Sequence, residues 1–280
     1  MSLLTPLLFA VAVAQPAPSS STCAAQSLLP AYAHNDYRNA RPLGDALALG
    51  YRGVEVDLLR ADETLLVGHD RDEVQATRTL ARLYLDPLRD HLRRCGHVLP
   101  DSTPFLVNIE LKEHDERAFR LLLDELDAYP ELFRPAAAGM PPPVRVVLVG
   151  WWPAPGANQR PWPEYVGVQL VPGDTNTSRA DTTGRPIALI TIAYGQGFTR
   201  TGRGGVPAKS RAALAEGRRL AAAFGVPLRV HHAPATLVVY QWLLSEGVTL
   251  VGATDLARSR DLLVQLPDGR LKATGTGFED

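Results

Sequence analysis

Short apolar runs alternate with longer amphipathic stretches through most of this chain. The apolar runs, rich in Val, Ile and Leu, predict strands at residues 30–34, 53–59, 104–111, 144–150, 166–171, 187–194, 227–232 and 249–253. The stretches between them carry apolar residues at helical spacing and predict helices at 40–50, 78–95, 114–128, 207–224, 235–246 and 256–265. This alternation predicts parallel strands joined by crossover helices.

Eight such strands in 280 residues predict a closed (β/α)8 TIM barrel that forms a single α/β domain over residues 29–266. An open, doubly wound sheet is the alternative fold. The Gly-rich nucleotide fingerprint expected after its first strand is absent, which favours the barrel. The Pro- and Gly-rich segments 135–143 and 172–186 are too short to separate two domains.

The first 14 residues are apolar and end in Ala12-Val13-Ala14, a small-residue pattern suited to cleavage. They predict a secretory signal peptide cleaved after Ala14, because the run is too short to span a bilayer. No Lys or Arg precedes the run, so a disordered or misassigned N-terminus is the alternative. We expect a secreted or periplasmic protein with a flexible linker at 15–28 and a mobile, polar tail at 267–280.

The cysteines and the charge limit the partners further. Cys23 and Cys95 are suited to a disulfide in an exported protein, but the sequence equally permits two free thiols. The formal net charge is -1, whereas a nucleic-acid partner requires a basic surface. We therefore expect no nucleic-acid partner.

Acidic residues occupy alternate positions in two neighbouring predicted strands. Glu55 and Asp57 share one face of strand 53–59, and Glu110 and Lys112 share one face at the end of strand 104–111. The apolar residues between them share the opposite face. A barrel strand turns one face to the helices and one to the lumen, so the charged faces are expected in the lumen, near the mouth where the strands end.

Buried carboxylates repel one another and lose their hydration, so they persist only when paired, protonated or bound to a metal. Three carboxylates with one lysine leave an excess of negative charge. A hard divalent cation would balance it, and an all-oxygen ligand set favours Mg²⁺ or Ca²⁺. For Glu55 and Asp57 alone, a solvated or ion-paired strand edge is the simpler interpretation, and the matching Glu110 favours the metal site.

His34 and His69 each follow a strand-like run, where TIM-barrel catalytic residues occur. Two imidazoles that flank a carboxylate pair are suited to general acid and base catalysis near neutral pH. Cleaving a phosphodiester requires both roles, one to activate the attacking group and one to protonate the leaving alkoxide. Lys112 would neutralise part of the phosphate charge. The sequence does not decide which histidine has which role.

As a set, four motifs resemble the phospholipase-C-like phosphodiesterase superfamily, which includes the glycerophosphodiester phosphodiesterases. They are His34-Asn35, Glu55-Val56-Asp57, Gly68-His69-Asp70 and Glu110-Leu111-Lys112. The branch named for altered inheritance of mitochondria is similar in further stretches, which are His34–Tyr37, Pro42-Leu43 and 78–88. The resemblance runs from about residue 30 to residue 265.

This resemblance implies a metal-dependent TIM barrel. It implies an acid/base pair (His34, His69), metal ligands (Glu55, Asp57, Glu110) and a lysine on the phosphate side (Lys112). The glycerophosphodiesterase pattern usually reads His-Arg-Gly, whereas Asn35 follows His34 here. Asn35 is therefore a candidate phosphate ligand or additional metal ligand, and glycerophosphodiester specificity does not follow from the motif.

Three further residues are candidates for lining the pocket. His231 and His232 stand where the superfamily tends to carry an aromatic residue, and a packing role is the alternative for both. Trp151 follows a predicted strand and would form an apolar wall for the substrate, or else cover the barrel end.

The residues and the resemblance together predict a secreted, metal-dependent phosphoric diester hydrolase of lipid metabolism. Its expected substrate is a glycerophosphodiester or a phospholipid-type diester, and contact with a membrane surface is a further expectation. The sequence leaves the oligomeric state open. The alternatives are an inactive barrel that binds a phosphorylated ligand or carbohydrate, a phospholipase-D-like lyase on choline or ethanolamine lipids, and a glycoside hydrolase that uses two of the carboxylates.

Overall fold

The computed structural model describes residue 23 and residues 27–153, 161–172, 186–195 and 208–266. The predicted signal peptide, most of the predicted linker and the predicted tail lie outside these residues. None of the helices within the described ranges has the length and apolar character needed to cross a membrane.

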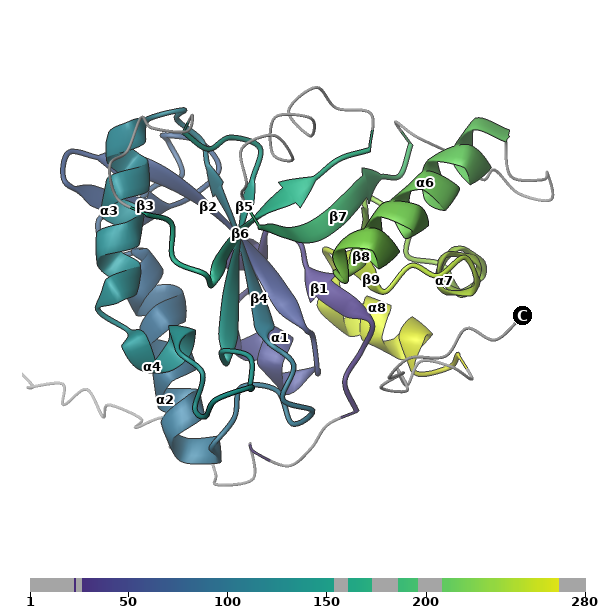
Figure 1. Ribbon diagram of the computed structural model, residues 1–280, viewed down its shortest axis with the longest axis horizontal. Coiled ribbons are helices and arrows are strands. Elements are labelled where there is room, and N and C mark those ends of the chain that lie inside the picture. Colours follow the sequence, from purple (N-terminus) through teal and green to yellow (C-terminus); the bar gives the residue numbers. More distant parts are fainter. Residues whose placement is uncertain (1–22, 24–26, 154–160, 173–185, 196–207, 267–280) are drawn as a thin grey trace, which may run out of the picture.

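Within the described residues, one sheet of nine strands makes up the centre of the molecule. In chain order they are β1 (Ala31–Ala33), β2 (Gly53–Ala61), β3 (Thr64–Val67), β4 (Phe105–Leu111), β5 (Val144–Val149), β6 (Val166–Leu170), β7 (Ile187–Ala193), β8 (Leu228–His231) and β9 (Leu250–Ala253). All except β3 run parallel, and β1 pairs with both β9 and β2, which closes the barrel (Figure 1). The predicted (β/α)8 barrel is therefore confirmed and the open sheet is excluded.

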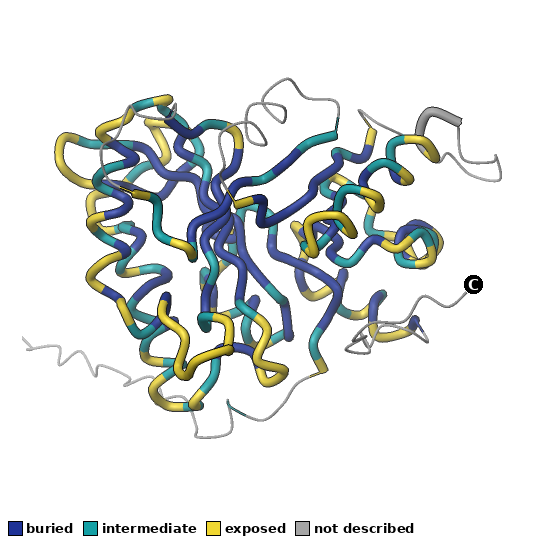
Figure 2. Tube along the Cα trace, viewed as in Figure 1, coloured by how far each residue is buried: buried dark blue, intermediate teal, exposed yellow. Residues whose placement is uncertain are grey.

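Helices surround the barrel, with their buried sides towards the strands (Figure 2). They are η1 (Asp36–Arg38), α1 (Gly44–Ala48), η2 (Ala81–Leu85), α2 (Asp86–Cys95), α3 (Glu116–Asp127), α4 (Pro130–Phe133), α6 (Ala208–Phe224), α7 (Leu237–Ser245) and α8 (Leu256–Leu263). The predicted helix 78–95 consists of the π-helical turn η2 followed by α2. Pro87 does not break it, and the helical conformation continues from the π-helical turn through the first turn of α2 that contains Pro87.

Strand alternation divides the apolar residues as the sequence predicted. Residues such as Val54, Val56 and Phe105 belong to the large cluster between the strands and the helices. A second, small cluster contains Leu106 and Val147, which alternate with the first set and so lie inside the barrel. Only part of the lumen is apolar, and the remainder holds the buried polar side chains.

The hairpin of β2 and β3 was not predicted. Residues Leu58–Ala61 of β2 pair with Val67–Thr64 of β3 in antiparallel register. Asp62 takes a positive φ of 52° in the two-residue turn, which is Asp-Glu and lacks the Asn-Gly or Asp-Gly signal of such turns. The consequence for the site is direct, since β3 brings His69 back to the barrel mouth.

Cys23 and Cys95 form a disulfide, with their Cα atoms 5.5 Å apart. Of the two alternatives that the sequence left open, the structure therefore contains the paired one. Cys95 is the last residue of α2, which leads into β4, so the disulfide lies at the barrel end opposite the mouth.

Candidate active site at the barrel mouth

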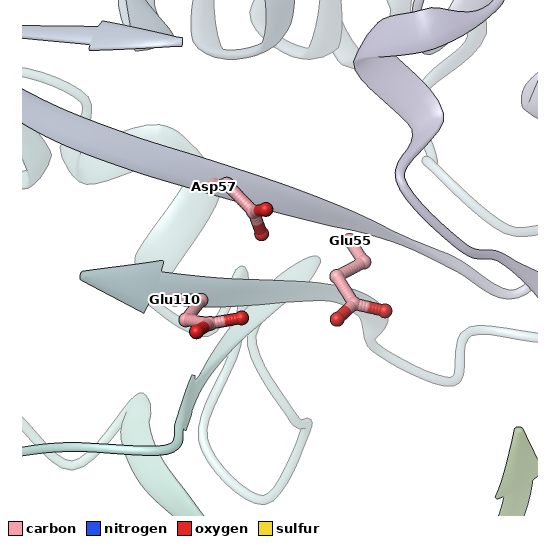
Figure 3. A group of neighbouring side chains, drawn as sticks. All are labelled: Glu55, Asp57 and Glu110. Carbon is pink, nitrogen blue, oxygen red and sulfur yellow. The ribbon is translucent and has the colours of Figure 1, made fainter. Parts of the chain in front are cut away.

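Three carboxylates from two adjacent strands converge in the lumen. Glu55 and Asp57 lie on β2 and Glu110 lies on β4, where Asp57 and Glu110 are partners in the parallel register. One oxygen from each carboxylate lies within 4.8 Å of the others, and the three side chains point towards a common space (Figure 3). Asp57 is 1% exposed and Glu55 is 5% exposed. The structure thus brings together all three predicted metal ligands.

Two tyrosine hydroxyls donate to this acidic triad. Tyr32 donates to Glu55 Oε2 over 2.7 Å, and Tyr37 donates to Asp57 Oδ2 over 2.9 Å. Among the described residues, the buried Asp57 Oδ1 has no hydrogen-bond partner. Burial, together with the charge of Glu110, raises the pKa of Asp57 to about 6. A buried anionic oxygen without a donor is suited to a cation, so these residues fit the predicted Mg²⁺ or Ca²⁺.

Lys112 follows β4 and lies beside the triad. Its Nζ is 3.1 Å from Glu110 Oε1 and 3.8 Å from Asp57 Oδ2. Burial alone would lower the pKa of Lys112, but the hydrogen bond to Glu110 and the charges of Glu110 and Asp57 outweigh burial and raise it. Lys112 therefore remains charged and partly offsets the acidic triad.

His69 lies on the Lys112 side of the triad. Its Nε2 is 3.4 Å from Lys112 Nζ, and its Nδ1 is hydrogen-bonded to Asp70 Oδ2 over 2.8 Å. Its backbone N–H donates to Glu73, which is ion-paired with Arg38. The Asp70 contact fixes the ring so that Nε2 faces the mouth. The His69 side chain is 39% exposed and is therefore accessible to a substrate.

His34 lies on the opposite side of the triad, directly after β1. Its Nε2 is 3.8 Å from Glu55 Oε2. Burial lowers the pKa of His34, and the attraction of Glu55 does not fully compensate, so the ring is neutral near pH 7. The two predicted acid/base histidines therefore flank the triad, one near Glu55 and one beyond Lys112. Asn35 follows in the left-handed region, with φ of 49°, and its role as a phosphate ligand stays a prediction.

The three candidate pocket residues lie at the same end of the barrel. His232 meets His34 edge to face at 5.0 Å between ring centroids, and His231 lies 4.5 Å from His232. Burial, reinforced by the charge of Arg229, lowers the pKa of His231 to about 3. Trp151 stacks on His114 at 5.6 Å with nearly parallel rings. Side chains that only pack around the rim of the barrel would make the same contacts, so a role in lining the substrate pocket stays a prediction for all three.

Arg229 on β8 is the charged residue that sequence reasoning missed. It is 2% exposed, and its Nη2 lies 3.3 Å from Glu55 Oε2. Its guanidinium carbon lies 4.1 Å from the centre of the Tyr32 ring. The signal was present, because Arg229 and His231 are two residues apart and share a strand face. The carboxylates therefore face two cationic side chains.

A TIM barrel with an acidic triad, a lysine and two histidines at its mouth has the parts of a phosphodiesterase-like enzyme. Residues 24–132 match the family model described as AIM6-like phosphodiesterase domain. The chain is 31% identical over 147 residues to the altered inheritance of mitochondria protein 6 of Eremothecium gossypii, covering 44% of this chain and 37% of that protein. It is 33% identical over 78 residues to the homologue from Arthroderma benhamiae, covering 26% of this chain and 25% of that protein.

The chain therefore spans 37% and 25% of the lengths of these two relatives. Among solved structures, it is similar to the glycerophosphodiester phosphodiesterase from Agrobacterium tumefaciens, with a TM-score of 0.38 and 11% identity, over 82% of this chain and 97% of that chain. The resemblance to the branch named for altered inheritance of mitochondria is confirmed over residues 24–132. The family match contains all the predicted metal and acid/base residues, whereas Arg229, His231 and His232 lie outside it.

Proposed function

We propose that this protein is a divalent-cation-dependent phosphoric diester hydrolase. The observation that carries the proposal is the acidic triad, with three carboxylate oxygens within 4.8 Å of one another and one buried Asp57 oxygen that has no partner among the described residues. The match of residues 24–132 to a phosphodiesterase domain supports the same reaction class.

Glu55, Asp57 and Glu110 would hold the cation, either Mg²⁺ or Ca²⁺. When bound, the cation supplies positive charge to a non-bridging phosphate oxygen. Lys112, 3.1 Å from Glu110, presents a second positive charge on the same side. Asn35 would contact the phosphate from the His34 side.

The surroundings of the two histidines favour different roles for them. His34 is kept neutral by burial, so it would remove the proton from the attacking hydroxyl or water. Asp70 holds Nδ1 of His69, and a carboxylate there stabilises the ring when it carries the proton that Nε2 passes to the leaving oxygen. When the attacking group is a hydroxyl of the substrate itself, the first product is a cyclic phosphate. Its hydrolysis then uses the two rings in reversed roles.

The proposed substrate is a glycerophosphodiester or a phospholipid-type diester, the class that the sequence resemblance implies. The proposed location is outside the cytoplasm, either secreted or periplasmic, with contact to a lipid surface where the substrate is a phospholipid. The Cys23–Cys95 disulfide supports such a location, because disulfides persist in oxidising compartments.

Hydrolysis of bis-(p-nitrophenyl) phosphate by the purified protein tests the reaction class. We expect turnover with Mg²⁺ or Ca²⁺, loss of turnover with EDTA, and recovery when the cation is restored. Asp57→Asn should remove turnover. Glu63→Gln is the matched control, since Glu63 is an exposed carboxylate on the hairpin turn between β2 and β3, where it pairs with Arg117 of α3. Turnover that is insensitive to EDTA would overturn the cation dependence. Binding of phosphodiesters without turnover across a panel of them would instead indicate an inactive binding barrel.

A further inference from the structure

A buried, positively charged arginine side chain lies in the lumen beneath the acidic triad. Arg229 is 2% exposed and lies between Glu55 Oε2, at 3.3 Å from Nη2, and Gln169 Oε1, at 3.4 Å from Nη1. Its guanidinium also covers the Tyr32 ring at 4.1 Å. The same Tyr32 donates to Glu55 Oε2, so Arg229 and Tyr32 hold one carboxylate oxygen together.

The barrel is shaped to admit this arrangement. Gly252 on β9 is the register partner of Tyr32, and a Cβ atom at Gly252 would lie 2.9 Å from Tyr32 Cε1. A larger residue at that position would displace the ring on which Arg229 rests. The stack of Arg229 on Tyr32 therefore depends on a third strand, in addition to the two that carry its members.

The charges at the site follow from these contacts. Glu55, Asp57 and Glu110 contribute three negative charges, and Lys112 and Arg229 contribute two positive charges. The site is then left with a single negative charge, which one divalent cation converts to a single positive charge. A phosphodiester, which carries one negative charge, brings the total to neutral.

We propose that Arg229 is a positioning residue, a permanent counter-charge that holds Glu55 in its ligating position in the cation-free protein. This inference rests on the proposed function for its cation, and on the geometry alone for its effect on stability. Arg229 does not touch substrate, because it is buried below Glu55. It stabilises the empty site and, since like charges repel, it also weakens the binding of the incoming cation.

Removing the guanidinium leaves the buried Glu55 charge with Tyr32 as its hydrogen-bond donor, which is costly in a dry interior. We therefore expect Arg229→Met to lower the Tm of the EDTA-treated protein. We expect added Mg²⁺ or Ca²⁺ to raise the Tm of this variant by more than it raises that of the wild type, because the cation replaces the missing charge. Its cation Kd, measured by calorimetry, should be tighter by about tenfold or more. Arg229→Lys retains the charge and should restore most of the Tm.

The double variant Glu55→Gln with Arg229→Met separates this role from simple packing. It removes both charges, so the Tm in EDTA should recover towards the wild-type value while the response to cation is lost. Arg145→Met is the matched control, since Arg145 is a half-buried arginine on β5 outside this network, and its variant should respond to cation as the wild type does. Where Arg229→Met alone does not fold, recovery of folding in the double variant supports the proposal. Failure of the double variant to recover overturns it.

The two proposals fail in different ways. A wild type that turns over diesters with Mg²⁺ or Ca²⁺, together with an unchanged Tm and an unchanged cation Kd in Arg229→Met, overturns the counter-charge and leaves the proposed function standing. A wild type that binds no cation overturns the proposed function. In that case the Tm in EDTA, with its recovery in the double variant, still decides whether Arg229 stabilises Glu55.

Discussion

The two halves of the barrel contribute different chemistry to the same mouth. β1 to β4 supply all three carboxylates, Lys112 and both flanking histidines. β5 to β9 supply Arg229, His231 and Trp151, which reach the site through Glu55, His34 or the rim. The match to a phosphodiesterase domain covers residues 24–132, which is the first of these halves. Under the proposed function, the reacting groups would therefore belong to the first half, and the second half would set the charge and shape around them.

Replacing either flanking histidine of the first half is expected to have the largest effect on turnover. His34→Ala or His69→Ala should lower kcat on a diester by about 10²–10⁴-fold, because each removes one proton-transfer group. His91→Ala is the control, since His91 lies on α2 near Cys95, towards the opposite end of the barrel. Circular dichroism should show that all three variants are folded. Wild-type turnover in both His34→Ala and His69→Ala would show that the acid and base lie elsewhere.

Breaking the disulfide tests whether the two ends of the barrel are independent. The bond closes a sequence separation of 72 residues, so Cys95→Ser should lower the free energy of unfolding by about 4 kcal/mol. Turnover at a temperature where the variant remains folded should be unchanged, because the disulfide lies opposite the mouth. Denaturant unfolding and the diester assay measure the two quantities. A loss of turnover without a loss of stability would contradict this separation.

Acidification should weaken cation binding in the first half. The pKa of Asp57 is raised to about 6, so below that pH a cation must displace a proton, and its apparent affinity should fall by about tenfold per pH unit. Calorimetry at pH 7.5, 6 and 5 measures this. The raised pKa also means that Asp57 contributes stability to the cation-free protein at low pH, and that this contribution is lost as the pH rises through about 6. Asp57→Asn should remove this decrease in stability with rising pH. If the stability of Asp57→Asn kept the pH dependence of the wild type, the raised pKa would not belong to Asp57.

Replacing a histidine of the second half should have the smallest effect. His232 meets the His34 ring at 5.0 Å and has an exposed side chain. His232→Ala should lower kcat by about tenfold at most, which corresponds to ~1.4 kcal/mol of barrier. The matched comparison is His34→Ala under the same conditions. An equal loss in the two variants would mean that the second half takes a direct part in the reaction.

The sequence predicted the barrel well because its signals are local. All eight parallel strands lie where the apolar runs placed them. The strand β3 was missed because its turn lacks the usual residues. Alternation also placed Glu55, Asp57 and Glu110 on lumenal faces, which the structure bears out.

The contribution of the second half was harder to predict, since it depends on contacts across the barrel. Arg229 and Glu55 are 174 residues apart, and no local pattern announces their pairing. Tyr32 was assigned to a strand, but its hydroxyl contact with Glu55 follows only from the closure of the barrel. The sequence also suggested a metal site from an excess of three carboxylates over one lysine. Arg229 reduces that excess, so the argument for a cation now rests on the geometry of the oxygens.

The length of β2 has a consequence for ion selection. This strand pairs with β1 and β4 inside the barrel and with β3 beyond it, so the backbone that bears Glu55 and Asp57 is held by ladder hydrogen bonds on both sides. Mg²⁺ and Ca²⁺ differ in their preferred oxygen distances, which are about 2.1 Å and about 2.4 Å. A ring of ligands anchored on so stiff a strand cannot widen or shrink freely. In the proposed cation site, adjustment to ionic radius would therefore fall to the side chain of Glu110, because its strand β4 is itself paired with β2 and β5 and Glu110 is the most exposed of the three.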